Sequence, residues 1–377
     1  MTPRERVLKT LRHELPDRTP AVLAARPEIN RMLMEHFGTD SMEDVHRALG
    51  TDGWGGAGLG VRFDEFERKV NGVLTGDCPY AGGSYIFHDA DTFEDAWGVV
   101  RRKGRDGKYV EWVSGPLVDA EDPDEYDFPT PDRIIDDPEL STKVEQQKAE
   151  GKFIKGGVTM PYKTAWELRG MENLLADYLM NPEFVEKLYD KIFALYGEIA
   201  RCLARAGIDM LTIGGDIAMQ DRIIMGPDAW RRIDKPRLAT LIQDAKAIKP
   251  DLHVFIHSDG NLNAILPDLI EIGFDVIDPI QPECMDPFEV KRMYGDRITL
   301  HGCGSVQRTL PFGTVDDVRR EVIGLIEGCG YNGGFILRAS NAIPFDTPLE
   351  NVLTFFETAR DYDLSQLFDH PLIPRNC

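Results

Sequence analysis

From residue 153 to residue 362, short runs of β-branched and apolar residues alternate with amphipathic helical segments. Two more apolar runs come before residue 60, so that the expected strands number eight: 20–25, 51–54, 153–158, 208–213, 253–257, 274–278, 297–301 and 334–338. Eight strands that each precede a helix are typical of a closed parallel barrel. No glycine-rich dinucleotide fingerprint follows the first run, which argues against an open doubly wound sheet. We therefore predict one α/β domain over residues 1–377, a (β/α)8 TIM barrel.

Residues 60–118 depart from this alternation. Polar and apolar residues take turns there, as in GSYIFHDADTF, and a period of two residues is the pattern of a half-buried strand. We predict that residues 60–118 form an antiparallel, β-rich insertion in the N-terminal third of the barrel.

The charge of the chain restricts its partners. With 64 acidic and 43 basic residues, the net charge is −21, which repels nucleic-acid phosphates and anionic membranes. No apolar run approaches the length of a membrane span, and the first residues lack the apolar core of a secretory signal. The six cysteines have no paired spacing, as expected of reduced thiols. We expect a cytoplasmic protein that binds neither nucleic acid nor membrane.

Metal-binding side chains gather where three of the expected strands end. His257 ends one strand, Glu283 and Cys284 follow the next, and Cys303 follows the third. The carboxyl ends of barrel strands open on one mouth, so residues distant in sequence meet there. Imidazole, carboxylate and thiolate are the ligands of zinc, which in catalytic sites keeps one position open. The sequence leaves open whether a metal is bound, and the candidate ligands are His257, Glu283, Cys284 and Cys303.

Acidic side chains near His257 are candidates for proton transfer. Asp216 follows two glycines at the end of the fourth strand, and Asp259 lies two positions after His257. A positioned carboxylate can act as a general acid or base. Two structural alternatives stay open, because Asp216 is also a suitable helix N-cap and His257 could be a core histidine. The candidate catalytic residues are His257, Asp216 and Asp259.

Aromatic and polar residues are expected around the same mouth. Trp54 and Tyr162 follow the second and third strands, where aromatic rings clamp flat ligands or pack against loops. Gln220 lies in the segment after the fourth strand, and Arg338 and Asn341 end the last one, where they could hold an anionic or polar group. The candidate substrate-binding residues are Trp54, Tyr162, Gln220, Arg338 and Asn341.

Five segments spread over most of the chain carry a family resemblance: RERVLKTLRHELPDRTP, GGDIAMQDRIIMGPDAW, LPDLIEIGFDVIDPIQP, FEVKRMYGDRITLHGCGSVQRTLPFGT and DTPLENV. They resemble the uroporphyrinogen decarboxylase superfamily, a barrel family that also contains corrinoid-dependent methyltransferases. The decarboxylases have an arginine-rich element after the first strand, whereas this sequence has AARPEIN with Arg26 alone. The chain is therefore more similar to the methyltransferase-like branch.

The resemblance also implies a metal position. In the thiol methyltransferases of this family, zinc is bound by a His-x-Cys pair and a later cysteine, and the matching residues here are His257, Asp259 and Asn341. One ligand is kept, one is replaced by an oxygen ligand, and the third is lost. The members that cleave aryl ethers or demethylate amines are closer analogues, because they use varied ligands.

The resemblance implies a methyltransferase. We expect it to move a methyl group from a methoxylated aromatic or a methylated amine to the cobalt(I) corrinoid of a partner protein docked at the mouth. Zinc or an acidic side chain would activate the donor. Two alternatives stay open: a decarboxylase of a small carboxylic acid that uses Asp216 and Arg338, and a barrel that binds without catalysis. The resemblance allows a monomer or a homodimer.

Overall fold

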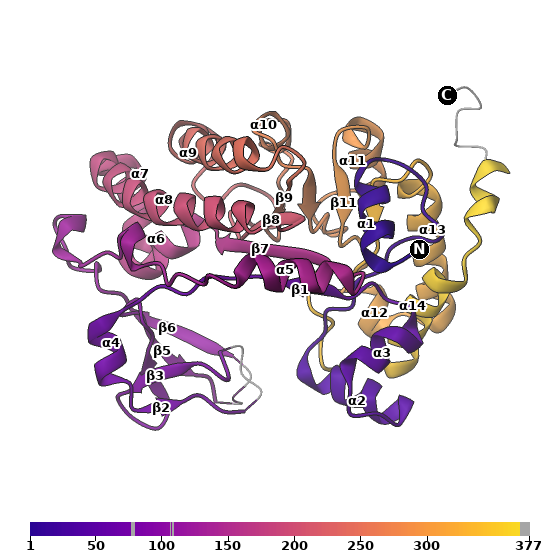
Figure 1. Cartoon of the computed structure of the whole chain (residues 1–377), viewed down its shortest axis with the longest axis horizontal. Helices are drawn as coiled ribbons and strands as arrows, with labels where there is room; N and C mark the ends of the chain where they lie inside the picture. The colour runs from indigo at the N-terminus through magenta and orange to yellow at the C-terminus, as the bar shows by residue number, and fades with distance from the viewer. Residues whose placement is uncertain (77–79, 106, 108, 370–377) are drawn as a thin grey trace.

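The computed structural model describes residues 1–369 except 77–79, 106 and 108. A parallel sheet of seven strands forms its centre, in the order β1 (Trp54–Gly56), β7 (Phe153–Thr159), β8 (Met210–Gly214), β9 (His253–His257), β10 (Val276–Asp278), β11 (Thr299–His301) and β12 (Phe335–Ile336). The sheet is curled, and helices lie along its outer side (Figure 1). The predicted α/β architecture with parallel strands is therefore confirmed.

The segment 20–25 differs from the prediction, because it forms isolated bridges rather than an eighth strand. Ala21 bridges Leu337, just after β12, and its carbonyl accepts a hydrogen bond of 2.7 Å from the backbone N–H of Asp52, just before β1. The segment thus lies between the two edge strands of the sheet, because it contacts the residue after β12 and a residue before β1. Pro20 at its start and Pro27, two residues beyond its end, lack a backbone N–H and so limit the length of any ladder there.

Side chains from the two faces of the sheet pack into separate cores. Residues such as Leu211 and Val254 point outward and join the large core beneath the helices. Met210 and Phe255 belong to a smaller core inside the curled sheet, which also contains Val7 of helix α1 (Pro3–Leu11). Because strand side chains alternate between faces, one strand supplies both cores. Helix α1 thereby fills the amino end of the interior and leaves the carboxyl end for a site.

The helices connect the strands and often begin with proline, whose missing N–H has no partner to lose in the first turn. None of the helices in the described part of the chain is both long and apolar enough to cross a membrane. Beside α1, they are α2 (Pro27–Phe37), α3 (Met42–Leu49), α5 (Leu140–Ala149), α6 (Pro161–Arg169), α7 (Met171–Met180), α8 (Pro182–Arg205), α9 (Pro227–Ile248), α10 (Leu266–Glu271), α11 (Pro287–Tyr294), α12 (Thr309–Phe312), α13 (Val315–Cys329) and α14 (Leu349–Asp361). Short 3-10 turns span Pro123–Glu125, Pro131–Arg133 and Leu364–Asp369.

A separate antiparallel sheet occupies the N-terminal third, as the alternating pattern predicted. It packs Tyr85 and Phe93 into a core of its own and lies apart from the parallel sheet in Figure 1. The indole N–H of Trp112 donates to the carbonyl of Glu167 (2.9 Å) and ties this sheet to α6. Its elements are α4 (Asp64–Lys69), β2 (Gly72–Val73), β3 (Ser84–Phe87), β4 (Thr92–Glu94), β5 (Val100–Lys103) and β6 (Val110–Ser114), with the strands in sequential order.

Candidate active site

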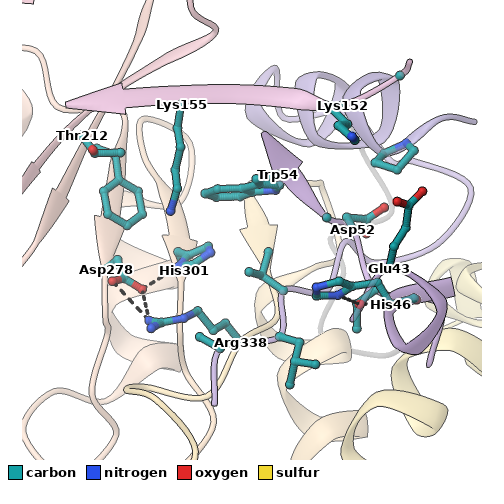
Figure 2. Close-up of a pocket in the computed structure, with 18 of the residues that line it drawn as sticks. Glu43, His46, Asp52, Trp54, Lys152, Lys155, Thr212, Asp278, His301 and Arg338 are labelled. Carbon is teal, nitrogen blue, oxygen red and sulfur yellow. Dashed lines mark hydrogen bonds and ion pairs between the residues drawn. The ribbon is translucent and has the colours of Figure 1, made fainter. Parts of the chain in front are cut away.

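A cavity of about 850 Å³ lies inside the curled parallel sheet. Its size suits a small organic ligand. Figure 2 shows charged and aromatic side chains that point into it from several strands. The strand side chains and strand-end residues in its wall are Trp54, Lys155, Thr212, Phe255, His257, Asp278, His301 and Arg338.

Asp278 is the centre of the hydrogen bonds in this cavity. It is 1% exposed and accepts from Nδ1 of His257 and from Nδ1 of His301, each over 2.5 Å, and from Nη1 of Arg338 over 3.0 Å. Burial opposes its ionisation, but the charges of Arg338 and His301 and the hydrogen bonds from both imidazoles hold the pKa of Asp278 far below its usual range. Asp278 is therefore an ionised acceptor that requires a proton on Nδ1 of both histidines.

The two histidines differ in their proton affinity. Burial opposes protonation of His257, yet its hydrogen bond to Asp278 and the nearby carboxylates raise its pKa above the usual value. Burial dominates for His301, which is 2% exposed, and its pKa is lowered. With Nδ1 committed to Asp278, Nε2 is the nitrogen of each ring that can meet a ligand. Nε2 of His301 is buried and has no hydrogen-bond partner among the described residues.

In the described part of the chain, one group of three side chains could bind a metal: Asp216, His257 and Asp259, whose ligand atoms lie within 4.8 Å of one another. The side-chain amide of Asn341 donates to Oδ2 of Asp259 (2.5 Å), while Oδ1 is buried without a partner among the described residues. Burial and the charge of Asp216 raise the pKa of Asp259. A metal cation beside Asp216 and Asp259 would offset the repulsion between the two carboxylates and would favour the ionised form of Asp259.

The cluster forms because two loops after neighbouring strands pack closely. Gly260 has φ +96°, and a Cβ atom at this position would lie 2.4 Å from the carbonyl oxygen of Met219. Only glycine therefore allows the loop after β9 to approach the loop after β8. The backbone N–H of Asp259 donates to Oδ1 of Asp216 (2.9 Å), and Ile217 N–H donates to Oγ of Ser258 (3.0 Å). These bonds place the carboxylate of Asp216 beside the end of β9.

The residues of this cluster fit a divalent metal. His257 has Nε2 available, and its Nδ1–H donates to a carboxylate, which is the arrangement that orients an imidazole ligand. Asp259 offers an unpaired, buried carboxylate oxygen. One imidazole with two carboxylates is a donor set that zinc accepts.

The structure does not bring the other expected zinc ligands into this cluster. Glu283 accepts a short hydrogen bond from the hydroxyl of Ser305 instead. Cys284 is half-buried, and burial together with the charge of Glu283 raises its pKa. Cys303 is 1% exposed within the large apolar core, where burial raises the pKa of its thiol well above the usual value. A protonated thiol is a poor metal ligand.

The expected substrate-binding residues divide into three groups. Trp54 and Arg338 line the cavity. Asn341 braces Asp259 from the loop after β12. Tyr162 is completely buried in the large core, and Gln220 is exposed, so neither lines the cavity.

Two charged residues of the cavity, Asp278 and Lys155, were not predicted from the sequence to be site residues. Asp278 ends β10, so its position at a strand end was the available signal. Lys155 lies within an otherwise apolar strand, and a charged residue at an inward position of a barrel strand is itself unusual. The period-two pattern of β7, counted from the buried Phe153, would have placed Lys155 on the inner face.

The comparisons with known proteins agree with this fold. The Uroporphyrinogen decarboxylase (URO-D) family model matches residues 109–362. Methylcobamide:CoM methyltransferase MtaA of Methanosarcina barkeri is 26% identical over 209 residues, which are 55% of this chain and 58% of that protein. Uroporphyrinogen decarboxylase 2 (chloroplastic) of Oryza sativa subsp. japonica is 24% identical over 179 residues, 48% of this chain and 43% of that protein.

A solved structure covers more of the chain. A methyltransferase from Methanosarcina mazei superposes with a TM-score of 0.64 at 19% identity, over 96% of this chain and 99% of that one. This likeness shows a shared fold. The matched part spans about half the length of the curated relatives. The resemblance predicted from the sequence, including the similarity to the methyltransferase-like branch, is confirmed. The chain belongs to the uroporphyrinogen decarboxylase (URO-D) family.

Proposed function

We propose that this protein is a methyltransferase that passes a methyl group from a small methylated substrate to the cobalt(I) corrinoid of a partner protein. The substrate is a methoxylated aromatic compound or a methylated amine. Two similar proteins from Methanosarcina barkeri strains bear the name methylcobamide:CoM methyltransferase, which supports chemistry at a corrinoid. The cavity inside the curled sheet, which reaches the strand ends at His257 and Asp278, supplies a place for the substrate beneath a docked partner.

The observation that carries the proposal is the cluster of Asp216, His257 and Asp259 beside the cavity. A methyl group leaves oxygen or nitrogen slowly, because the leaving atom is basic. Zinc, held by Nε2 of His257 and the carboxylates of Asp216 and Asp259, would act as a Lewis acid on the leaving atom when bound. In this position the metal would lie at one end of the cavity.

The side chains around the cluster have definable tasks. Asp278 keeps the proton of His257 on Nδ1 and so keeps Nε2 free for a ligand. Asn341 fixes the rotamer of Asp259 through Oδ2. Trp54 and Phe255 supply apolar walls that exclude water from a bound substrate. The partner would approach along the strand axis, since α1 fills the opposite end.

The test is conversion of cob(I)alamin to methylcob(III)alamin, followed by absorbance, with a panel of methoxylated aromatic compounds and methylated amines. We expect turnover by the metal-loaded wild type, and loss of turnover together with bound metal in Asp259→Asn. Asp228→Asn is the matched control, because this carboxylate is fully exposed at the start of α9. It should retain both properties.

The result that would overturn the proposal is release of CO2 from a small carboxylic acid without any corrinoid. That outcome would indicate a decarboxylase, the activity named for the rice relative. Turnover that survives both chelation and Asp259→Asn would remove the metal from the proposal.

A further inference from the structure

Beside Asp278, two cationic side chains, Lys155 and Arg338, line the cavity. The ammonium group of Lys155 faces the indole of Trp54 at 5.3 Å from the ring centroid. In the described part of the chain, no carboxylate lies within ion-pairing distance of this ammonium. Burial and the charge of Arg338 lower the pKa of Lys155, although the charge of Asp278 acts in the opposite direction.

Asp278 cannot balance both cations. Its two oxygens already accept from His257, His301 and Arg338. Arg338 in turn uses only Nη1 on this carboxylate, so the rest of its fork has no acceptor among the described residues. Figure 2 shows the side chains of Lys155 and Arg338 on opposite sides of His301 and both directed into the cavity. A guanidinium and an ammonium with open donors are a receptor for an anion.

The walls beside these donors are aromatic. The ring centroids of Trp54 and His301 are 5.5 Å apart with an interplanar angle of 38°, and the ring of Phe255 lies 5.5 Å from His301. Aromatic side chains stack on planar rings and keep them in a fixed orientation. An anion attached to a planar ring would therefore meet both its charge partners and its apolar partners here.

The anion subsite and the metal-binding cluster are joined through one carboxylate. Arg338 binds Asp278 on the cavity side, and His257 binds the same carboxylate while it contributes to the cluster with Asp259. A molecule held by its anionic end at Arg338 would therefore lie next to the carboxylate that also binds His257. The proposed function requires its methoxy group to point toward His257.

We propose that the substrate is an aromatic carboxylate, bound with its carboxylate between Lys155 and Arg338 and its ring against Trp54 and Phe255. That this substrate carries a transferable methyl group at its far end rests on the proposed function, whereas binding of the anion does not. The inference selects the anionic members among the methoxylated aromatic compounds and disfavours quaternary amines, whose positive charge the two cations would repel.

The experiment measures binding by calorimetry without any corrinoid, with 4-methoxybenzoate and its neutral analogue 4-methoxybenzamide as probes. Wild type should bind the carboxylate at least about tenfold more tightly than the amide, an amount that one charge-assisted contact supplies. Lys155→Met should clearly reduce this preference while Arg338 remains, and Lys155→Arg should keep most of it. Lys69→Met is the control for net charge, because Lys69 is exposed on α4; it should bind like the wild type.

Equal affinity for the two probes, or an unchanged preference in Lys155→Met with normal circular dichroism, would overturn the inference. Cyclohexanecarboxylate tests the role of the aromatic ring. If it binds as tightly as 4-methoxybenzoate, the proposed packing of an aromatic ring against Trp54 and Phe255 is wrong. The two proposals fail separately. Corrinoid methylation by an amine without binding of benzoates overturns this inference alone, and tight binding of 4-methoxybenzoate without any methyl transfer overturns the proposed function alone.

Discussion

The Oδ2 atom of Asp278 lies 2.5 Å from Nδ1 of His257, and the other oxygen of the same carboxylate lies 2.5 Å from Nδ1 of His301. One buried acid at the end of β10 thus fixes the tautomer and the orientation of two imidazoles on the strands at either side, β9 and β11. The pair of contacts requires β10 to lie between β9 and β11, as the strand order shows. Both Nε2 atoms are consequently the free nitrogens of the site.

Replacement of Asp278 by asparagine should weaken metal binding by roughly 10- to 100-fold, the usual effect of removing a carboxylate that orients a histidine ligand. Asn cannot accept from both imidazoles and Arg338 with its one oxygen. Competition with a chromophoric chelator would measure the zinc affinity. Asp228→Asn on the surface should leave the zinc affinity unchanged. If Asp278→Asn binds zinc as tightly as the wild type, Asp278 has no part in metal binding.

Metal affinity should depend on pH through His257. Its pKa is raised above 6.5, so below that raised value a proton occupies Nε2 and competes with the metal. We expect the apparent affinity to rise about tenfold per pH unit in the acidic range and to level off once the imidazole is neutral. Zinc titrations from about pH 6 to about pH 9 would show this. A flat profile would contradict the assignment of Nε2 as a ligand.

Cys303→Ala should retain the full metal content and cost on the order of 1 kcal/mol in the free energy of unfolding, since a small buried side chain is truncated. Asp259→Ala should lose the metal. Metal analysis after dialysis and urea denaturation would test both variants. The opposite pattern, with metal lost from Cys303→Ala and kept by Asp259→Ala, would favour the ligand set predicted from the sequence.

A second buried carboxylate should make the stability depend on pH. Asp234 on α9 is 1% exposed and accepts from the hydroxyl of Tyr178 (3.1 Å), and burial raises its pKa to about 7. The folded protein therefore keeps a proton that the unfolded chain loses near pH 3.8. The free energy of unfolding should fall as the pH rises from about 4 to about 7, by up to ~4 kcal/mol.

Asp234→Asn should remove this fall, because an amide accepts the same hydrogen bond without ionising. Urea denaturation at about pH 5 and about pH 8 would compare the variant with Asp190→Asn, whose exposed carboxylate pairs with Arg237. The control should keep the pH dependence of the wild type. An unchanged dependence in Asp234→Asn would assign the effect to other groups.

The sequence predicted the regular part of the fold well. The run 253–257 became β9 with the same bounds, and His257 and Asp259 did come together with Asp216, because loops after adjacent parallel strands meet at one edge. The early chain was harder to predict. Strand β1 begins at Trp54, where the expected strand ended, since apolar residues alone do not fix the register of a short strand.

Cys303 shows why the ligand set could not be predicted. Counting by twos from His301 puts both side chains on the inner face. The rule ends with the strand, however, and Gly302 has φ +70°, a left-handed conformation that redirects the chain. Cys303 therefore enters the outer core and does not reach the candidate metal site. That site is formed by Asp216, His257 and Asp259 instead, and Gly260 lets the loops around it pack closely. Such turns depend on tertiary packing that local sequence does not record.

Because Asp278 serves both the imidazole of the metal-binding cluster and the guanidinium of the anion subsite, occupancy of the two places is thermodynamically linked. An anion that draws Arg338 away would leave the carboxylate more basic and its hold on His257 firmer. By reciprocity, whatever factor the anion imposes on the affinity for metal, the metal must impose on the affinity for the anion. Through the one carboxylate of Asp278, binding of the metal and binding of the anion would then be cooperative.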